Sequence, residues 1–243
     1  MKPMLALEVE QGVVKKFPEI AVGGFLVAGL KALSAGPADL MQRARAGLID
    51  RGLCVQNLSD EPRAAAWRDA FRRMGLKPST YKSSPEQLAR RLLKGDVIST
   101  PLPVVDIYCA ISAKHLAAMG GYDLARLPEP KVVVRFAEPA SDRFVPLSGR
   151  VEDMPLSPDV VVYACGAEVI CYGFNYRDSR KTCLERETDL AAFFSEGVAA
   201  THGASVCGAL AELRQVLSDA GALVGPIRFA SKESPGAVLS LEG

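Results

Sequence analysis

The sequence is poor in the side chains that build metal centres. Its 243 residues include two histidines, His115 and His202, and its six cysteines form no Cys-x-x-Cys pair. Zinc sites usually take a tetrahedral set of Cys or His ligands at short spacings. We therefore expect no metal ion and no other cofactor. The cysteines are expected to be free thiols of a reducing compartment; they are Cys54, Cys109, Cys165, Cys171, Cys183 and Cys207.

Long apolar runs and familiar catalytic motifs are also lacking. The longest apolar run, Ile20 to Leu30, is about half of the ~20 residues that a membrane-spanning helix needs. Glu8 and Glu10 precede it, which does not match a signal peptide. The sequence has no Gly-Lys-Ser/Thr phosphate loop, no Gly-x-Ser-x-Gly elbow and no His-Glu-x-x-His motif. These absences argue against a membrane protein, a P-loop enzyme and a zinc protease, and predict a cytoplasmic protein.

What remains has the composition of an ordinary globular protein, with 49% hydrophobic and 23% charged residues. Short apolar or alternating runs predict strands at residues 4–9, 13–17, 20–27, 131–136, 144–147, 160–164, 168–173, 191–196 and 222–229. Helical spacing predicts helices at residues 38–49, 60–75, 84–95, 104–119 and 204–218. The expected fold class is α+β, a mainly antiparallel β-sheet system flanked by helices in one domain spanning residues 1–243. The same spacing predicts that these side chains are buried in one continuous fold: Trp67, Phe71, Leu88, Leu92, Val105, Leu116 and Leu210.

Positive charge is concentrated in the segment from Arg63 to Lys94. It holds nine Lys and Arg residues against Asp69 and Glu86, whereas the whole chain has a net charge of +1. Such a segment is either a solvated helical face or a surface that attracts a polyanion. If it binds RNA, the candidate phosphate contacts are Arg72, Arg73, Lys82, Arg90, Arg91 and Lys94.

The second helix of this segment is expected to begin with a capping box. Ser84 would accept a hydrogen bond from the backbone N–H of Gln87, and the Gln87 side chain would reach back. Leu88 and Leu92 share the apolar face of this helix, so the basic residues at positions 90, 91 and 94 are expected to project away from it.

Two polar segments interrupt the apolar pattern. At Gly120–Asp123 a helix is expected to end in a tight turn, where glycines let the backbone approach a ligand and offer N–H groups to an oxyanion. The alternative is a simple helix stop with Asp123 capping the turn. The second segment, Asn175–Thr182, packs amide, guanidinium, carboxylate and hydroxyl groups into eight residues. It is either a ligand-binding loop or a solvated hairpin turn.

An ordered set of motifs resembles a known family. Along the chain the motifs are Trp67-Arg68-x-x-Phe71, the run from Ser83 to Gly95, Val105-Asp106-x-Tyr108, Gly120-Gly121-Tyr122-Asp123-Leu124, Arg135-Phe136, Phe144-x-Pro146-Leu147 and Asn175-x-Arg177-Asp178-Ser179-x-x-Thr182. Together, over about residues 15 to 200, they resemble the B3/B4 domain of the phenylalanyl-tRNA synthetase beta subunit, in the form found as a separate protein. In the synthetase, that domain hydrolyses tyrosine wrongly attached to the phenylalanine tRNA.

The resemblance implies a similar α+β fold, a charged tRNA as partner and a metal-independent ester hydrolysis. It places a pocket between the Gly-Gly-Tyr-Asp motif and the loop around Asp178. In that pocket Asp178 would orient water or the amino group, and the substrate would contact Gly120, Gly121, Tyr122, Asn175, Arg177, Ser179 and Thr182.

Three positions depart from the pattern of the family. Gly120 stands where the synthetase has a histidine, only Asp178 corresponds to its glutamate, and Cys109 stands where we expect a polar amide. The amino acid that the site accepts is therefore left open. Two functions remain: a trans-editing deacylase that hydrolyses a mischarged aminoacyl-tRNA, and a non-catalytic module that binds a tRNA end or a free amino acid.

Overall fold

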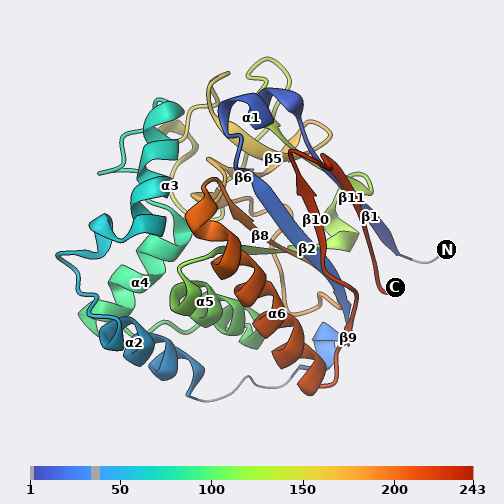
Figure 1. The fold of residues 1–243 in the computed structure, drawn as a ribbon. Coiled ribbons are helices and arrows are strands. Elements are labelled where there is room, and N and C mark those ends of the chain that lie inside the picture. The colour runs from blue at the N-terminus through green and yellow to red at the C-terminus, as the bar shows by residue number, and fades with distance from the viewer. Residues whose placement is uncertain (1–2, 34–38, 243) are drawn as a thin grey trace.

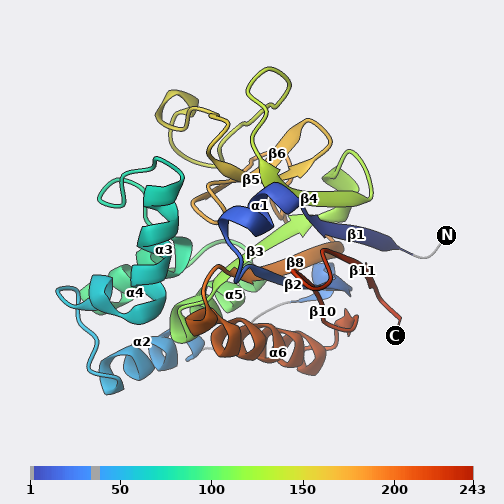
Figure 2. The same cartoon turned by 45° about the horizontal axis from the view of Figure 1, so that its top comes forward.

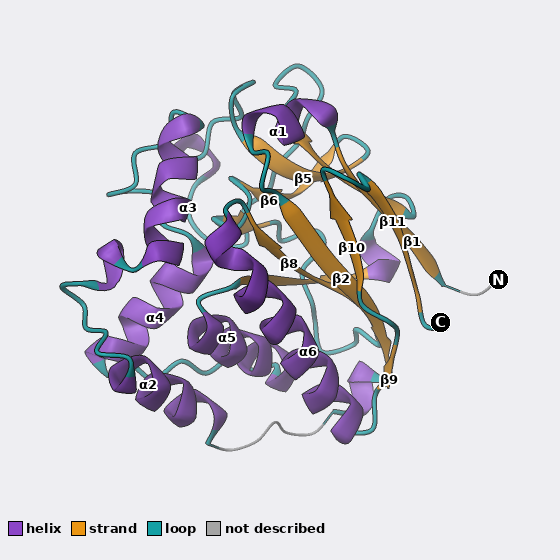
Figure 3. Cartoon of the chain, viewed as in Figure 1, coloured by secondary structure: helices purple, strands orange, loops and turns teal. Residues whose placement is uncertain are grey.

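The computed structural model describes residues 3–33 and 39–242 and contains two β-sheets covered by helices on one side (Figures 1 and 3). One sheet has the strand order β11-β1-β4-β5-β6-β7, and the other has the order β10-β2-β8-β3, with β9 also paired to β2. All pairings are antiparallel except that of β1 with β4. The predicted α+β class is confirmed.

The strands are β1 (Met4–Val9), β2 (Ala21–Ala28), β3 (Ala118–Asp123), β4 (Lys131–Phe136), β5 (Val161–Cys165), β6 (Glu168–Tyr172), β7 (Arg177–Asp178), β8 (Leu190–Gly197), β9 (Leu223–Val224), β10 (Arg228–Ser231) and β11 (Gly236–Ser240). The α-helices are α1 (Gln11–Lys16), α2 (Leu40–Asp50), α3 (Pro62–Arg73), α4 (Ser84–Lys94), α5 (Pro103–His115) and α6 (Gly203–Asp219). Short 3₁₀ helices are η1 (Leu30–Ala32), η2 (Leu58–Asp60), η3 (Leu124–Arg126), η4 (Val151–Asp153) and η5 (Ala200–His202).

Two hydrophobic cores lie on opposite faces of the sheet that contains β8. Successive side chains of a strand point to opposite faces, so Ala192 and Phe194 of β8 pack toward the first sheet, whereas Ala191 and Phe193 pack toward helices α2, α4, α5 and α6. Figure 2 shows this layer of helices below the two sheets. The sheet that carries β8 is therefore buried on both faces, and it positions residues for the cavity described below.

Four segments differ from the sequence-based expectations. Residues 13–16 belong to helix α1, with Phe17 as its C-cap, and not to a strand. The Phe17 N–H donates to the Val13 carbonyl at 2.7 Å, and Lys15, which a strand would place on the same face as the buried Val13 and Phe17, is exposed. Residues 144–147 form no strand, although Pro146 makes an isolated bridge with Ser179. The strand expected at 222–229 is divided into β9 and β10, and β11 was not expected. The start of the helix expected at 38–49 lies outside the described residues, and its described part begins at Leu40.

The largest difference concerns the predicted helix end at Gly120–Gly121. Helix α5 ends at His115, because Leu116 adopts a left-handed conformation with a φ of 51°. The chain then forms strand β3, in which both glycines are paired with β8. The backbone amides of the two glycines thus lie in a β-ladder and not at a free helix terminus.

The expected burial holds for Trp67, Phe71, Leu92, Leu116 and Leu210, whereas Leu88 and Val105 are half-buried against the helical core.

The segment from Arg63 to Lys94 is packed into the fold. Its predicted capping box is not formed, because the Gln87 backbone N–H donates to the Ser83 carbonyl and the Gln87 side chain donates to the Lys82 carbonyl. In the described part of the chain, no helix has the length and apolar character needed to cross a membrane.

Candidate functional site

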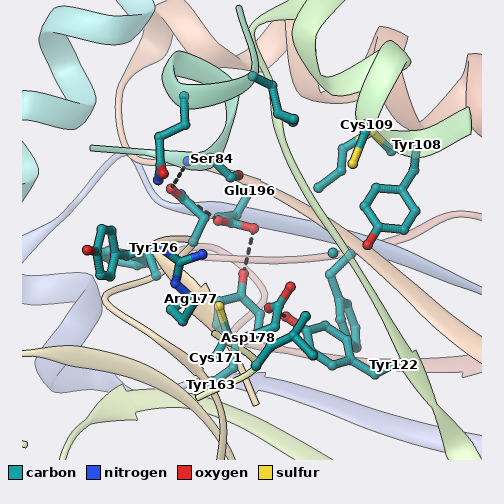
Figure 4. Close-up of a pocket in the computed structure, with 18 of the residues that line it drawn as sticks. Ser84, Tyr108, Cys109, Tyr122, Tyr163, Cys171, Tyr176, Arg177, Asp178 and Glu196 are labelled. Atoms are coloured by element: carbon teal, nitrogen blue, oxygen red, sulfur yellow. Dashed lines mark hydrogen bonds between the residues drawn. The ribbon is translucent and has the colours of Figure 1, made fainter. Parts of the chain in front are cut away.

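A cavity of about 220 Å³ lies between one face of α4, the middle of α5 and the strands β3, β5, β6, β7 and β8 (Figure 4). Aromatic rings form part of its walls, and two carboxyl groups, Asp178 and Glu196, face it. Its lining includes Arg91, Tyr108, Gly120, Tyr122, Tyr163, Phe174, Asn175, Arg177, Asp178, Phe194 and Glu196.

Strand β3 forms one wall through alternate residues. Gly120 and Tyr122 line the cavity, whereas a side chain at Gly121 would point to the other face, toward Phe193 and Leu184. A Cβ atom at Gly120 would lie 2.8 Å from the hydroxyl oxygen of Tyr122. The missing side chain at position 120 therefore leaves the space in which the Tyr122 ring lies. From there the Tyr122 hydroxyl donates to Asp178 Oδ1 at 2.8 Å.

The opposite wall begins at a sharp bend after β6. Gly173 and Phe174 have φ values of 64° and 62°, and a left-handed conformation is unusual for a phenylalanine. The bend brings Asn175 under the start of α4, where its backbone and side-chain oxygens accept from the Ser84 N–H at 3.2 and 3.3 Å. Asn175 Nδ2 in turn donates to Glu196 Oε1 at 2.8 Å. The bend thus connects α4 to the buried carboxyl group of β8.

The two carboxyl groups have environments that disfavour their charge. Burial raises the pKa of Glu196 to about 7, against hydrogen bonds from Asn175 and Tyr163 that lower it. Burial also raises the pKa of Asp178, while hydrogen bonds from Cys171 and Tyr122 and the charge of Arg177 oppose this effect. Glu196 therefore exchanges its proton close to neutral pH, as groups that take part in proton transfer often do.

Glu196 was not among the residues that the sequence indicated. The sequence carries a usable signal, since Glu196 is the one charged residue in the otherwise apolar or small run from Leu190 to Gly197. A charged residue in a buried strand is unusual unless it is paired or functional. The strand itself was predicted, but the face to which Glu196 points depends on the pairing of β8 with its neighbours.

The structure brings together five of the eight predicted site residues, namely Gly120, Tyr122, Asn175, Arg177 and Asp178. The other three do not line this cavity. Gly121 faces the helical core, Ser179 is buried with its hydroxyl accepting from the Lys181 N–H, and Thr182 is fully buried. Residues 179 and 182 follow β7 away from the cavity, because their backbone turns to bridge Pro146 and to accept from the Asp123 N–H.

The predicted phosphate contacts fall into two groups. On α4, Arg91 lines the cavity and is exposed, and the exposed Lys94 lies about one turn further along the same helix. The other four do not line the cavity: Arg72 lies near Asp69, Arg73 over the Phe17 ring, Lys82 against the Ser79 carbonyl, and Arg90 between Glu86 and the Val55 carbonyl. Arg72 and Arg73 are exposed, as Arg91 is, whereas Arg90 is half-buried.

Neither histidine contributes to the cavity. His202 is buried against the Trp67 ring with Nε2 close to the Arg63 carbonyl, and burial lowers its pKa. His115 lies 2.6 Å from a carboxylate oxygen of Glu212 on α6. Among the residues that the structure describes, no group of three or more His, Cys, Asp and Glu side chains is arranged to hold a metal ion.

The fold and the cavity define an α+β protein with two mainly antiparallel sheets and a cavity that holds two carboxyl groups beside aromatic rings. The chain belongs to the B3/4 domain family, whose sequence model matches residues 66–206. The match contains all the residues that line the cavity, including Asp178 and Glu196. A comparison with curated proteins finds no match.

Among solved structures, the chain is similar to an N-terminal fragment of the phenylalanyl-tRNA synthetase beta-subunit from Pyrococcus horikoshii, with 12% sequence identity and a TM-score of 0.47. The similarity covers 90% of this chain and 49% of that chain. The protein thus spans about half the length of the fragment.

Proposed function

We propose that this protein is a trans-editing deacylase, which hydrolyses the ester of a mischarged aminoacyl-tRNA in the cytoplasm and so protects translation fidelity. Membership of the B3/4 family supports a role connected with tRNA. The observation that carries the proposal is the pair of carboxyl groups, the buried Glu196 and the half-buried Asp178, in a cavity large enough for a small molecule.

The chemistry of the proposed reaction is simple enough for these residues. An aminoacyl ester is activated, so its hydrolysis needs a positioned water molecule and stabilisation of the developing oxyanion. Asp178, fixed by the Tyr122 hydroxyl, is the proposed acceptor of the proton from water. Its raised pKa makes it a stronger base than an exposed aspartate.

The remaining cavity residues would position the substrate. Asn175 is held between α4 and Glu196, and Arg177 donates to the Ser148 hydroxyl at 3.0 Å. We assign stabilisation of the oxyanion to Arg177 and to the Tyr108 hydroxyl, because both side chains line the cavity together with Asp178. Figure 4 shows this hydroxyl pointing into the cavity.

The tRNA would approach over α4. Arg91 and Lys94 lie beside the cavity and are exposed, so they are the proposed contacts for the phosphates of the single-stranded 3′ end. Contacts to Arg72, Arg73, Lys82 and Arg90 would require these side chains to leave their present partners and are expected to contribute less.

The alternative function is a module that binds a tRNA end or a free amino acid without hydrolysis. It is favoured by the absence of both histidines from the cavity lining and by Arg177, which could pair with the carboxylate of a free amino acid. A deacylation assay over a panel of aminoacyl-tRNA pairs separates the two functions. Hydrolysis well above spontaneous ester loss, and reduced in Asp178→Ala, supports the enzyme. Binding without any such turnover supports the module.

A further inference from the structure

The charges of the cavity are unevenly distributed. Glu196 is almost completely buried among aromatic rings, whereas Arg91 is exposed and lies 3.7 Å from Asp96. Arg177 and Asp178 are half-buried, and the Arg177 guanidinium lies over the Tyr176 ring at 5.2 Å. Glu196 is therefore the acidic group of the interior, and Arg91 is the cation that solvent reaches.

Of the two carboxyl groups that line the cavity, Glu196 has only neutral hydrogen-bond partners. Its two oxygens accept from Asn175 Nδ2 at 2.8 Å and from the Tyr163 hydroxyl at 3.0 Å, both neutral donors. The groups that shift its pKa are these two donors, burial and the like charge of Asp178. Asp178 differs, because Arg177 favours its charged form. A cation that entered the cavity would therefore be stabilised most at Glu196.

The side chains around Glu196 suit a compact ammonium group. Each carboxylate oxygen has two lone-pair directions, so Glu196 can accept further hydrogen bonds beside those from Asn175 and Tyr163. The rings of Tyr163, Phe174 and Phe194 line the same cavity. The negative faces of aromatic rings attract ammonium groups, and an apolar surrounding strengthens the attraction between opposite charges.

We propose that Glu196 binds the free α-ammonium group of the substrate, so that the site accepts aminoacyl esters with an unmodified amine and rejects N-acylated ones. This inference rests on the proposed function, since it concerns the same cavity. The ammonium group would lie at Glu196 and the ester carbonyl between Asp178 and Arg177, which Figure 4 labels. The nucleotide would lie outside, near Arg91. Glu196 would thus select the substrate, and Asp178 would act on water.

The test compares each aminoacyl-tRNA of the panel with its N-acetyl derivative, using wild-type protein and Glu196→Gln. Glutamine keeps the size of the side chain and can retain contacts with Asn175 and Tyr163, but it carries no charge. Wild-type protein should hydrolyse the free-amine substrate about 10- to 100-fold more efficiently than the acetylated one, as expected when a charged hydrogen bond is lost. In Glu196→Gln that preference should disappear through a higher KM for the free-amine substrate.

Glu212→Gln is the matched control, because Glu212 lies on α6 and contacts Lys114 and His115 outside the cavity. This variant should keep the preference for a free amine. Thermal unfolding of all variants checks that they are folded. If Glu196→Gln does not fold, the comparison of acetylated with free-amine substrates on wild-type protein still decides whether the amine is recognised.

A binding experiment separates failure of this inference from failure of the proposed function. The probes are 3′-aminoacylamino-3′-deoxyadenosines carrying alanine, phenylalanine or tyrosine, which cannot be hydrolysed as esters, and their N-acetyl forms. Binding of free-amine probes alone, without turnover of any tRNA, supports recognition by Glu196 and overturns the deacylase. Equal hydrolysis of free and acetylated tRNA supports the deacylase and overturns the role of Glu196. No binding of any probe and no turnover overturns both.

Discussion

Two glutamates are almost completely buried, and their surroundings differ. Glu86 on α4 is 1% exposed and accepts from Arg68 at 2.6 and 3.0 Å and from Arg90 at 3.2 Å. Glu196 on β8 is 3% exposed, accepts from neutral donors and faces a cavity. The first arrangement fastens α3 to α4. The second arrangement leaves the charge of the Glu196 carboxyl group poorly compensated. Such a group contributes little to the stability of the fold and is suited to binding a ligand.

The largest effect is expected for a change in the cavity that contains Glu196, and it concerns the rate of deacylation. Asp178→Ala should lower the rate of deacylation by about 10²- to 10⁴-fold, because a positioned acid–base group is lost. Single-turnover kinetics with the best substrate of the panel would measure it. Asp159→Ala, at an exposed aspartate that lies near Lys16, is the control and should keep full activity. A decrease of less than tenfold in Asp178→Ala would mean that Asp178 only orients the substrate.

On the side of the helices the expected effect is on stability. Glu86→Gln removes the negative charge shared by Arg68 and Arg90 and should lower the free energy of unfolding by about 3 kcal/mol, as when one partner of a buried ion pair is removed. Urea unfolding monitored by circular dichroism gives this value. A loss below about 1 kcal/mol would show that the ion pairs of Glu86 contribute less to the free energy of unfolding than its contacts indicate.

The pH dependence of stability should distinguish the same two sites. The pKa of Glu196 is raised from an ordinary 4.5 to about 7, so the folded protein binds more protons than the unfolded chain between these values. Stability should therefore fall as pH rises through this window, by about 3 kcal/mol in total. Glu196→Gln should lack this contribution and Glu138→Gln, at an exposed residue, should retain it. Superimposable curves for wild type and Glu196→Gln from unfolding at several pH values would contradict the assignment.

The smallest effect is expected for tRNA affinity. Arg91→Ala/Lys94→Ala should weaken binding and reduce the magnitude of the log–log salt slope by about 0.7 for each lost phosphate contact. The paired variant Arg72→Ala/Arg73→Ala changes cations of α3 that do not line the cavity and should have less effect. Filter binding at several salt concentrations measures both. A larger effect of the α3 variant would indicate that the tRNA contacts α3 and not α4.

The sequence was most informative where one local pattern dominates. Lys131–Phe136 contains three successive valines and forms β4 with the predicted bounds, and Trp67 and Phe71 face the core as their spacing predicts. The motif around Asp178 also indicated Asn175, Arg177 and Asp178, and the Gly-Gly-Tyr-Asp motif indicated Gly120 and Tyr122, all of which line the cavity. These features depend on local pattern, which a sequence contains directly.

The features that the sequence did not predict depend on contacts between distant segments. Gly120 and Gly121 follow an apolar helix and would suit a turn, but their pairing with β8 makes them part of a strand. Strand β11 is stabilised by pairing with β1 at the other end of the chain. The role of Arg90 depends in part on the carbonyl of Val55, and the orientation of Glu196 depends on neighbouring strands. None of these relations is visible in local periodicity.

The pairing of β1 with β11 has a practical consequence for engineering. Leu5 lies opposite Leu239, so the first and last strands of the fold are immediate neighbours. Both ribbon views place them on the side of the molecule away from α3 and α4 (Figures 1 and 2). A short linker could join these strands, and the chain could be reopened at the exposed Gly221 after α6. Such a circular permutant, or a fluorescent reporter fused beside either strand, would leave the approach to α4 unobstructed.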